Sequence, residues 1–473
     1  MDLLRLPLLG PFFHWRHARL SLQLVLLVIA AAIVAHGLTG PQIAPRNLAT
    51  VLTSIHWRGL LIVGLLAAGN LFCTACPMML VRDTGRRFYH PALRWPRRLR
   101  GKWLGLVLLA LVLFVYELFD LWSLPRATAW FVIGYFALAL VVDLVFAGAS
   151  FCKYLCPIGQ FNFIASSMSP TELQVRDLST CRTCHTADCI KGRHSLLEPR
   201  RVERRGCELS LFLPMKVGNL DCTMCLDCVQ ACPHDNIALT TRVPGAEWLD
   251  PRRRSGIGRL MQRRDIAALA VVFTFAALLN AFAMTAPSSL VERRLAAIVG
   301  VQSEAPALLL LFVIGLVVVP LALVGGAGWT MRSLSASATP LRDTITRYAF
   351  PLVPIGVGVW LAHYGFHLLT GLATVVPVMQ SAAIDLSGHA LFGEPAWGWV
   401  GMQPGSVFPL QLGVVLLGAA GSAGLVHATS LRDHPAAARR ASVPWLVLVA
   451  LLTTTAVWIL SQPMEMRAVG VFG

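Results

Sequence analysis

The chain has 473 residues, of which 56% are hydrophobic and only 14% are charged. Soluble globular domains carry about a quarter charged residues, so this composition excludes an ordinary soluble enzyme and indicates a helical membrane protein. The formal net charge of +16 would suit a nucleic-acid-binding protein, but the basic residues cluster beside apolar runs. That distribution is typical of loops facing an anionic cytoplasmic leaflet, so we expect the lipid bilayer, and no nucleic acid, as a partner.

Apolar runs predict a polytopic, mainly α protein with about nine transmembrane helices. They lie at roughly 20–38, 59–72, 103–119, 129–151, 266–285, 306–328, 348–376, 406–428 and 444–461. The run at 348–376 contains Pro351 and Pro354, which can interrupt a helix. Arginine-rich loops predict that the protein lies in a bacterial inner membrane, with the long polar stretch on the cytoplasmic side. The predicted division is a membrane domain at 1–156, a cytoplasmic ferredoxin-like α+β domain at 157–265, and a second membrane domain of about five helices at 266–473.

The first two helical hairpins each end at a cysteine pair followed by proline. The two motifs are Cys73-Thr-Ala-Cys76-Pro77 and Cys152-Lys-Tyr-Leu-Cys156-Pro157. Their recurrence predicts an internal repeat, with intervals that differ by one residue. These four thiols could jointly hold a further iron–sulfur cluster, act as two redox-active dithiols, or bind copper(I) or zinc. Inert buried cysteines are the alternative without function, and recurrence before proline argues against it.

The polar stretch holds eight further cysteines in two groups. The second group, Cys222-Thr-Met-Cys225-Leu-Asp-Cys228-Val-Gln-Ala-Cys232-Pro233, has the spacing of bacterial ferredoxins that bind [4Fe–4S] clusters. A zinc site usually shows two separated CxxC pairs, and disulfides do not favour four thiols so close together. We therefore predict an iron–sulfur cluster at this run.

The first group is irregular: Cys181-Arg-Thr-Cys184 is followed by Cys189 after a longer gap, and by Cys207 well downstream. By analogy with two-cluster ferredoxins, the fourth cysteine of each group ligates the other cluster. One cluster would then be held by Cys181, Cys184, Cys189 and Cys232, and the other by Cys222, Cys225, Cys228 and Cys207. The alternative is one cluster plus a degenerate half that carries zinc or free thiols.

Two histidines, His363 and His367, share one face of a predicted transmembrane helix. Ionisable residues within a membrane are candidates for function. Haem iron, copper or a quinol site would each suit these imidazoles, and hydrogen-bonded packing between helices is the alternative.

The cysteine motifs give the chain a family resemblance over about residues 1–245. Two hairpins that end in Cys-Pro motifs, followed by a ferredoxin run, resemble the NapH/NosR-type membrane polyferredoxins. The resemblance implies electron transfer from quinol or a cytoplasmic donor toward extracytoplasmic reductases. A related branch, the CcoG-type maturation proteins, is linked to copper-centre assembly. This chain differs in its irregular first ferredoxin group, its second membrane half, and the lack of a long amino-terminal flavin-bearing domain.

We therefore predict a membrane-bound electron-transfer subunit, not a self-contained enzyme, and we assign no catalytic residues. Its expected cofactors are two [4Fe–4S] clusters, with a further cluster, copper or haem in the membrane part. Its expected partners are quinone or quinol, or a cytoplasmic donor, and a membrane or periplasmic reductase, cupredoxin or cytochrome. A copper-reducing assembly factor for an extracytoplasmic metalloenzyme is the second hypothesis, and a transporter with a regulatory iron–sulfur domain is a third.

Overall fold

A computed structural model describes residues 1–89, 91–194, 202–301 and 303–464 of the chain. Short pieces of two predicted domains, at 195–201 and from 465 onward, lie outside these residues. The chain forms two compact units, each built from several separate segments. Unit 1 contains Met1–Ala30, Gly64–Gly105 and Gly134–Arg263, and unit 2 contains Ala31–Val63, Leu106–Ile133 and Arg264–Gly473.

Eight helices in the described residues are long and apolar enough to cross a membrane. They are Ala18–Thr39, Leu48–Ala68, Pro125–Val145, Arg264–Ala283, Glu304–Ser335, Leu341–Thr370, Pro404–Asp433 and Pro435–Ser461. The predicted polytopic helical architecture is confirmed. The span expected at 103–119 corresponds to α7 (Trp103–Leu118), which is apolar but has only 16 residues. The second span begins about ten residues earlier than expected, because a π-helical turn, Val51–Trp57, continues into α4 (Arg58–Ala68).

Unit 1 combines the ends of several long helices with short elements. The long helices that contribute to it are α2 (Ala18–Thr39), α4, α7 and α8 (Pro125–Val145). Its short helices are α1 (Leu9–His14), α5 (Leu71–Thr74), α6 (Pro77–Gly85), α9 (Pro157–Ala165), α10 (Leu178–Thr183), α11 (Asp188–Lys191) and α12 (Asp227–Ala231). Four cysteines lie within these short helices and four more cap their ends, so the geometry of the helix ends determines where these thiols lie. The first four are Cys73, Cys181, Cys189 and Cys228, and the capping ones are Cys76, Cys156, Cys184 and Cys232.

Three antiparallel strand pairs complete unit 1. They join β1 (Thr171–Val175) to β4 (Ile237–Thr241), β2 (Arg193–His194) to β3 (Val202–Arg204), and β5 (Arg253–Arg254) to β6 (Gly258–Arg259). In the first pair Leu173 lies opposite Leu239, and both are buried. This pair brings the chain before Cys181 next to the chain after Cys232.

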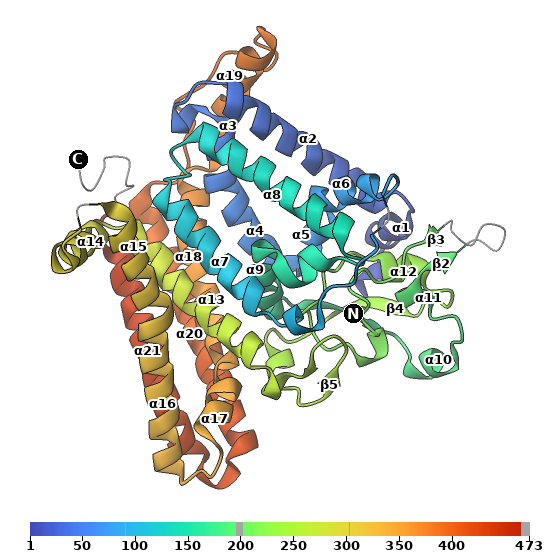
Figure 1. Cartoon of the computed structure of the whole chain (residues 1–473), viewed down its shortest axis with the longest axis vertical. Coiled ribbons are helices and arrows are strands. Elements are labelled where there is room, and N and C mark those ends of the chain that lie inside the picture. Colours follow the sequence, from blue (N-terminus) through green and yellow to red (C-terminus); the bar gives the residue numbers. More distant parts are fainter. Residues whose placement is uncertain (90, 195–201, 302, 465–473) are drawn as a thin grey trace. The chain divides into compact units, whose positions relative to one another are not determined.

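Unit 2 is a bundle of long helices (Figure 1). Besides α3 (Leu48–Thr50) it contains α13 (Arg264–Ala283), α14 (Ala286–Val299), α15 (Glu304–Val313), α16 (Val319–Ser335), α17 (Leu341–Tyr348), α18 (Val353–Thr370), α19 (Val375–Ser387), α20 (Pro404–Asp433) and α21 (Ala438–Ser461). The prolines at 351 and 354 do not break the seventh span, because they lie in a 3₁₀ turn and the first turn of α18.

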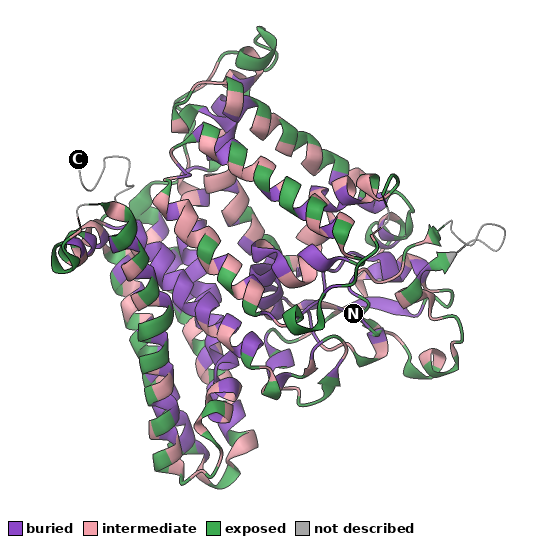
Figure 2. Ribbon diagram, viewed as in Figure 1, coloured by how far each residue is buried: buried purple, intermediate pink, exposed green. Residues whose placement is uncertain are grey.

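Helices α18 and α20 approach each other closely at glycines. A Cβ atom on Gly358 would lie 2.8 Å from the carbonyl oxygen of Val414, and one on Gly418 would lie 2.6 Å from that of Pro354. Small residues at such crossings let membrane helices pack backbone to backbone. Helices α13 and α18 are largely buried, as the purple ribbon of α13 shows in Figure 2. The imidazoles of α18 therefore lie inside the bundle.

Candidate functional site

The regular ferredoxin run forms a tight loop with left-handed turns. Asp221, Met224 and Leu226 have φ angles of 61°, 47° and 63°. Residues other than glycine rarely adopt this conformation, and alternating turns of this kind point successive N–H groups toward one side. Leu226 precedes α12, whose second residue is Cys228, and Cys232 caps the end of that helix. The loop thus wraps its thiols around one side of the chain.

The irregular group repeats this local structure. Ala187 has a φ of 52° and precedes α11, which begins with Asp188 and has Cys189 as its second residue. The regular group has the same order, a left-handed residue, an aspartate and then the third cysteine, at Leu226, Asp227 and Cys228. The two extra residues are absorbed between Cys184 and Ala187, before the helix starts.

The structure brings Cys232 to the first group, as swapped ligation requires. Burial, followed by the nearby thiols of Cys232, Cys181 and Cys184, raises the pKa of Cys189 to about 11. Asn236 connects both ends of this set: its backbone N–H donates to Cys232 Sγ at 3.4 Å, and its side-chain amide donates to Cys181 Sγ at 3.3 Å.

Cys207 lies with the other group. Burial and the neighbouring thiol of Cys222 raise the pKa of Cys207 to about 11, against N–H groups that lower it. Burial, and then the thiols of Cys207 and Cys222, also raise the pKa of Cys228. The backbone N–H of Cys207 donates to the carbonyl of Cys189 at 2.8 Å, which fixes the displaced cysteine in place. Leu211 N–H donates to Cys207 Sγ at 3.3 Å.

These two sets have the features of cluster sites. No group of three or more His, Cys, Asp or Glu among the described residues is arranged to hold a single metal ion. Each cysteine of a [4Fe–4S] cluster binds a different iron, so its ligands surround a volume and not one point. The N–H donors to Cys181, Cys207 and Cys232 are the kind of hydrogen bond that tunes such clusters. Four thiols in each set, with N–H donors beside them, fit an iron–sulfur cluster.

The two cysteine pairs at the hairpin ends have matching structures. Cys76 precedes Pro77 at the start of α6, and Cys156 precedes Pro157 at the start of α9. Proline is well suited to the first position of a helix. The extra residue in the second motif is accommodated by a π-helical turn, Phe151–Leu155, where the first motif has α5. The geometry therefore accounts for the one-residue difference between the two motifs.

The four hairpin thiols lie near one another. Burial, followed by Cys156, Asp143, Cys76 and Cys73, raises the pKa of Cys152. Burial raises the pKa of Cys156 to about 12, against hydrogen bonds that lower it.

Polar and sulfur groups surround this hairpin set. Tyr135 Oη lies 2.9 Å from Cys156 Sγ, and Asn162 Nδ2 donates to Cys73 Sγ at 3.6 Å. Met79 Sδ lies 3.4 Å from Cys152 Sγ. This sulfur-rich environment suits a soft metal or a cluster.

The regular loop docks directly against the first hairpin pair. Met224 is fully buried, and its carbonyl accepts a hydrogen bond from Thr74 Oγ1 at 2.6 Å. Asn70 donates through its side chain to the carbonyl of Cys222 at 3.0 Å and through its backbone N–H to Met224 Sδ at 3.1 Å. Thr74 follows Cys73 directly, so the loop of Cys222 and the turn of Cys73 share a hydrogen-bonded interface.

A buried ionic network lies beside the same loop. Glu208, next to Cys207, is 2.8 Å from Arg19 and 2.9 Å from Arg82. Arg19 also bonds Asp227 at 2.6 Å. Burial alone would raise the pKa of Glu208, but the two arginines hold it at about 2. This network ties α2 and α6 to the segments that carry Cys207 and Cys228.

No sequence motif includes Asn236, Asn70 or Glu208. Each is an ordinary polar residue, and its partners are distant in the chain, as in the pair of Asn70 with Cys222. All three lie close to a candidate cysteine ligand: Glu208 directly follows Cys207, Asn70 precedes Cys73 by three residues, and Asn236 follows Cys232 by four. The role of Asn236 depends on the pairing of β1 with β4, which the sequence did not define.

His363 and His367 lie in unit 2, with ring centroids 5.0 Å apart. His363 is fully buried. Neither ring nitrogen of His363, nor Nε2 of His367, has a hydrogen-bond partner among the described residues. The hydrogen-bonded interhelical packing given as the alternative is not seen for these nitrogens among the described residues.

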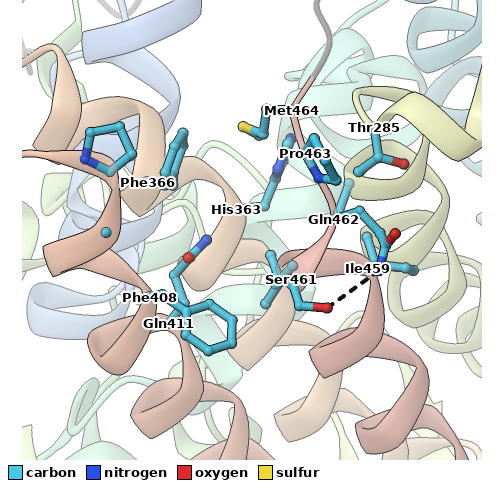
Figure 3. A pocket seen from close by; sticks show the side chains of 14 residues that line it. Thr285, His363, Phe366, Phe408, Gln411, Ile459, Ser461, Gln462, Pro463 and Met464 are labelled. Carbon is cyan, nitrogen blue, oxygen red and sulfur yellow. Dashed lines mark hydrogen bonds between the residues drawn. The ribbon is translucent and has the colours of Figure 1, made fainter.

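A cavity of ≈ 500 Å³ opens beside His363 (Figure 3). Its walls come from α18, α20, the end of α13 and the end of α21. Phe366 and Phe408 supply aromatic surface, and Gln411 supplies an amide whose nitrogen donates to the carbonyl of Ala362 at 3.2 Å.

Two relatives from Escherichia coli (strain K12) match the chain. The "Ferredoxin-type protein NapH" is 28% identical over 192 residues, which cover 37% of this chain and 64% of NapH. The "Putative electron transport protein YccM" is 27% identical over 94 residues, which cover 20% of this chain and 22% of YccM. The chain is similar to NapH and YccM over these segments. The resemblance predicted from the cysteine motifs is confirmed.

The matches to NapH and YccM span less than two thirds of either protein. No family model matches the chain, and no solved structure matches it. The predicted class, a membrane protein of iron–sulfur electron transport, agrees with both relatives. Neither relative is named for copper handling, so they give no support to the copper hypothesis.

Proposed function

We propose that this protein is an electron-transfer subunit of the bacterial inner membrane, with two [4Fe–4S] clusters held on its cytoplasmic side. Cys181, Cys184, Cys189 and Cys232 would hold one cluster, and Cys222, Cys225, Cys228 and Cys207 the other. The observation that carries the proposal is that the fourth cysteine of each group lies next to cysteines of the other group. Asn236 bonds both Cys232 and Cys181, while Cys207 lies beside Cys222 and Cys228.

The residues around the thiols are suited to this role. A [4Fe–4S] cluster supplies reversible one-electron transfer when it is bound. The N–H donors at Leu211 and Asn236 would stabilise negative charge on the sulfurs that they touch. Burial of Cys222, Cys225 and Cys228 keeps water from these ligands. The interface formed by Met224, Asn70 and Thr74 connects this loop to the hairpin thiols.

We propose the electron donor and the electron acceptor by chemical class. A quinol in the bilayer or a reduced cytoplasmic carrier would donate, and a membrane or periplasmic reductase, cupredoxin or cytochrome would accept. The cytoplasmic position is supported by the arginines of the 77–102 loop and of the polar stretch.

Iron analysis tests the proposal. Protein purified anaerobically should contain about eight irons and eight acid-labile sulfides per chain, and dithionite should bleach its broad visible absorption. About twelve irons would add a cluster at Cys73, Cys76, Cys152 and Cys156. About four irons would contradict the two-cluster assignment, and zinc without iron would contradict the function itself.

A further inference from the structure

The cavity beside His363 has the size and lining of a small-molecule site. Ligand pockets enclose roughly 300–1,000 Å³ and combine apolar walls with a few polar groups. This one, at ≈ 500 Å³, is lined by Ala281, Phe366, Phe408, Ile459 and Leu460, with His363, Gln411 and Thr285 among them. Figure 3 shows His363, Phe366, Phe408, Gln411 and Ile459 around one space. The lining comes from α13, α18, α20 and α21. All of these helices are apolar spans of unit 2, so the lining favours a ligand that dissolves in the bilayer.

His363 indicates that this ligand has oxygen atoms. Its side chain is fully buried, lines the cavity, and has no hydrogen-bond partner for either ring nitrogen among the described residues. A buried polar group without a partner costs about 1–3 kcal/mol, so such groups are usually satisfied by something. An imidazole can donate from one nitrogen and accept at the other. A carbonyl or hydroxyl group in the cavity would satisfy it, whereas an acyl chain would not.

We propose that this cavity binds the ring of a membrane quinone, with His363 bonded to one of its oxygen atoms. Phe366 and Phe408 supply flat surfaces for a flat ring. Gln411 is held on the wall by its bond to Ala362 and offers a second polar contact. The inference rests on the proposed electron-transfer function, for which it names the lipid-soluble partner and its site. The site lies in the half of the chain beyond the cysteine motifs.

Haem is the competing occupant, and the geometry disfavours it. His363 and His367 are four residues apart on α18, so both imidazoles approach from one helix and cannot bind opposite faces of one haem. His363 is the one histidine in the described lining of the cavity. A quinone needs only one such hydrogen bond.

Binding of decylubiquinone to the detergent-solubilised full chain tests the proposal. The wild-type protein should bind it saturably, and His363→Phe should weaken binding about tenfold through loss of one buried hydrogen bond. His363→Asn keeps a polar group and should retain most of the affinity. Gln411→Leu should weaken binding less than His363→Phe. His427→Phe, at an exposed histidine of α20 outside the cavity, should bind like the wild type.

Three results would overturn the site: no saturable binding to the wild type, equal affinity in His363→Phe and wild type, or a sharp Soret band showing haem in the purified protein. Iron is measured on the same samples. Saturable quinone binding in a protein without iron would overturn the proposed function but leave the site standing. Eight irons without quinone binding would overturn the site alone.

Discussion

Asn236 joins two segments that are distant in the chain. Its side-chain amide donates to the carbonyl of Asp177 at 2.6 Å and to Cys181 Sγ, while its carbonyl oxygen accepts from Asp177 N–H at 2.9 Å. Its own backbone N–H reaches Cys232 Sγ. One residue thus fixes the start of α10 and contacts a cysteine of each group. A hydrogen bond to a cluster sulfur stabilises the reduced, more negative state.

Replacing Asn236 with alanine should therefore lower the reduction potential of one cluster. Loss of one net hydrogen bond of about 1 kcal/mol corresponds to about 40 mV for a one-electron couple. Potentiometric titration followed by electron paramagnetic resonance measures the shift. Gln174→Ala on β1, which removes an exposed hydrogen bond to Thr240 of β4, is the control and should leave both potentials unchanged. Unaltered potentials and iron content in Asn236→Ala would contradict the role of this residue.

Glu208 is the second residue with a predicted effect, here on stability. It lies between Arg19 and Arg82 in a buried site. Replacing it with glutamine removes the negative charge that both guanidinium groups share. Breaking a buried ion pair costs about 3–5 kcal/mol. Glu208→Gln should therefore aggregate at a lower temperature in a heating series read by size-exclusion chromatography. Glu203→Gln, at an exposed residue of β3, should match the wild type, and equal behaviour of the two variants would refute the prediction.

At the scale of elements, both cysteine-rich parts contain a repeated unit. The third cysteine of each ferredoxin group is the second residue of a short helix that follows a left-handed residue. Each hairpin ends with a cysteine before a proline-initiated helix of nine residues. The spacing of the thiols was enough to predict the regular loop and the repeat. It was not enough to predict how Cys207 comes to lie beside Cys222 and Cys228. That position depends on a backbone hydrogen bond from Cys207 to Cys189.

Single cysteine replacements should divide the ligands into two sets, and each set should contain cysteines from both sequence groups. Cys207→Ser should abolish the same paramagnetic signal as Cys228→Ser, and Cys232→Ser the same one as Cys184→Ser, with each variant losing about four irons. The reason for this expected pairing is that each fourth cysteine lies beside the other group. Cys73→Ser is the comparison variant, which should keep both signals. A Cys207→Ser protein that retains both clusters would show that the two groups do not exchange ligands.

For the whole molecule, the sequence predicted the helical spans better than the compact units. Apolar runs identify helices because backbone groups in lipid must bond within their own segment. The units divide several of those helices: α2, α4, α7 and α8 each contribute residues to both. Such a division depends on which helix ends pack together, and hydropathy carries no information on that. The histidines were identified from the sequence, but the cavity was not, because its lining comes from four separate helices.

Whether the short helix α7 crosses the membrane determines on which side the following loops lie. Its 16 residues reach about 24 Å at 1.5 Å per residue, somewhat less than the roughly 30 Å hydrocarbon core. Arginines 94, 97, 98 and 100 precede it, so we expect it to cross outward from the cytoplasm, with flanking residues completing the span. An alkaline phosphatase fusion after Ser123 should then be active, whereas fusions after Arg100 and after Cys232 should be inactive. Green fluorescent protein fusions at the same three sites should give the opposite pattern. An inactive phosphatase at Ser123 would mean that α7 does not cross, and an active one at Cys232 would place the proposed clusters outside.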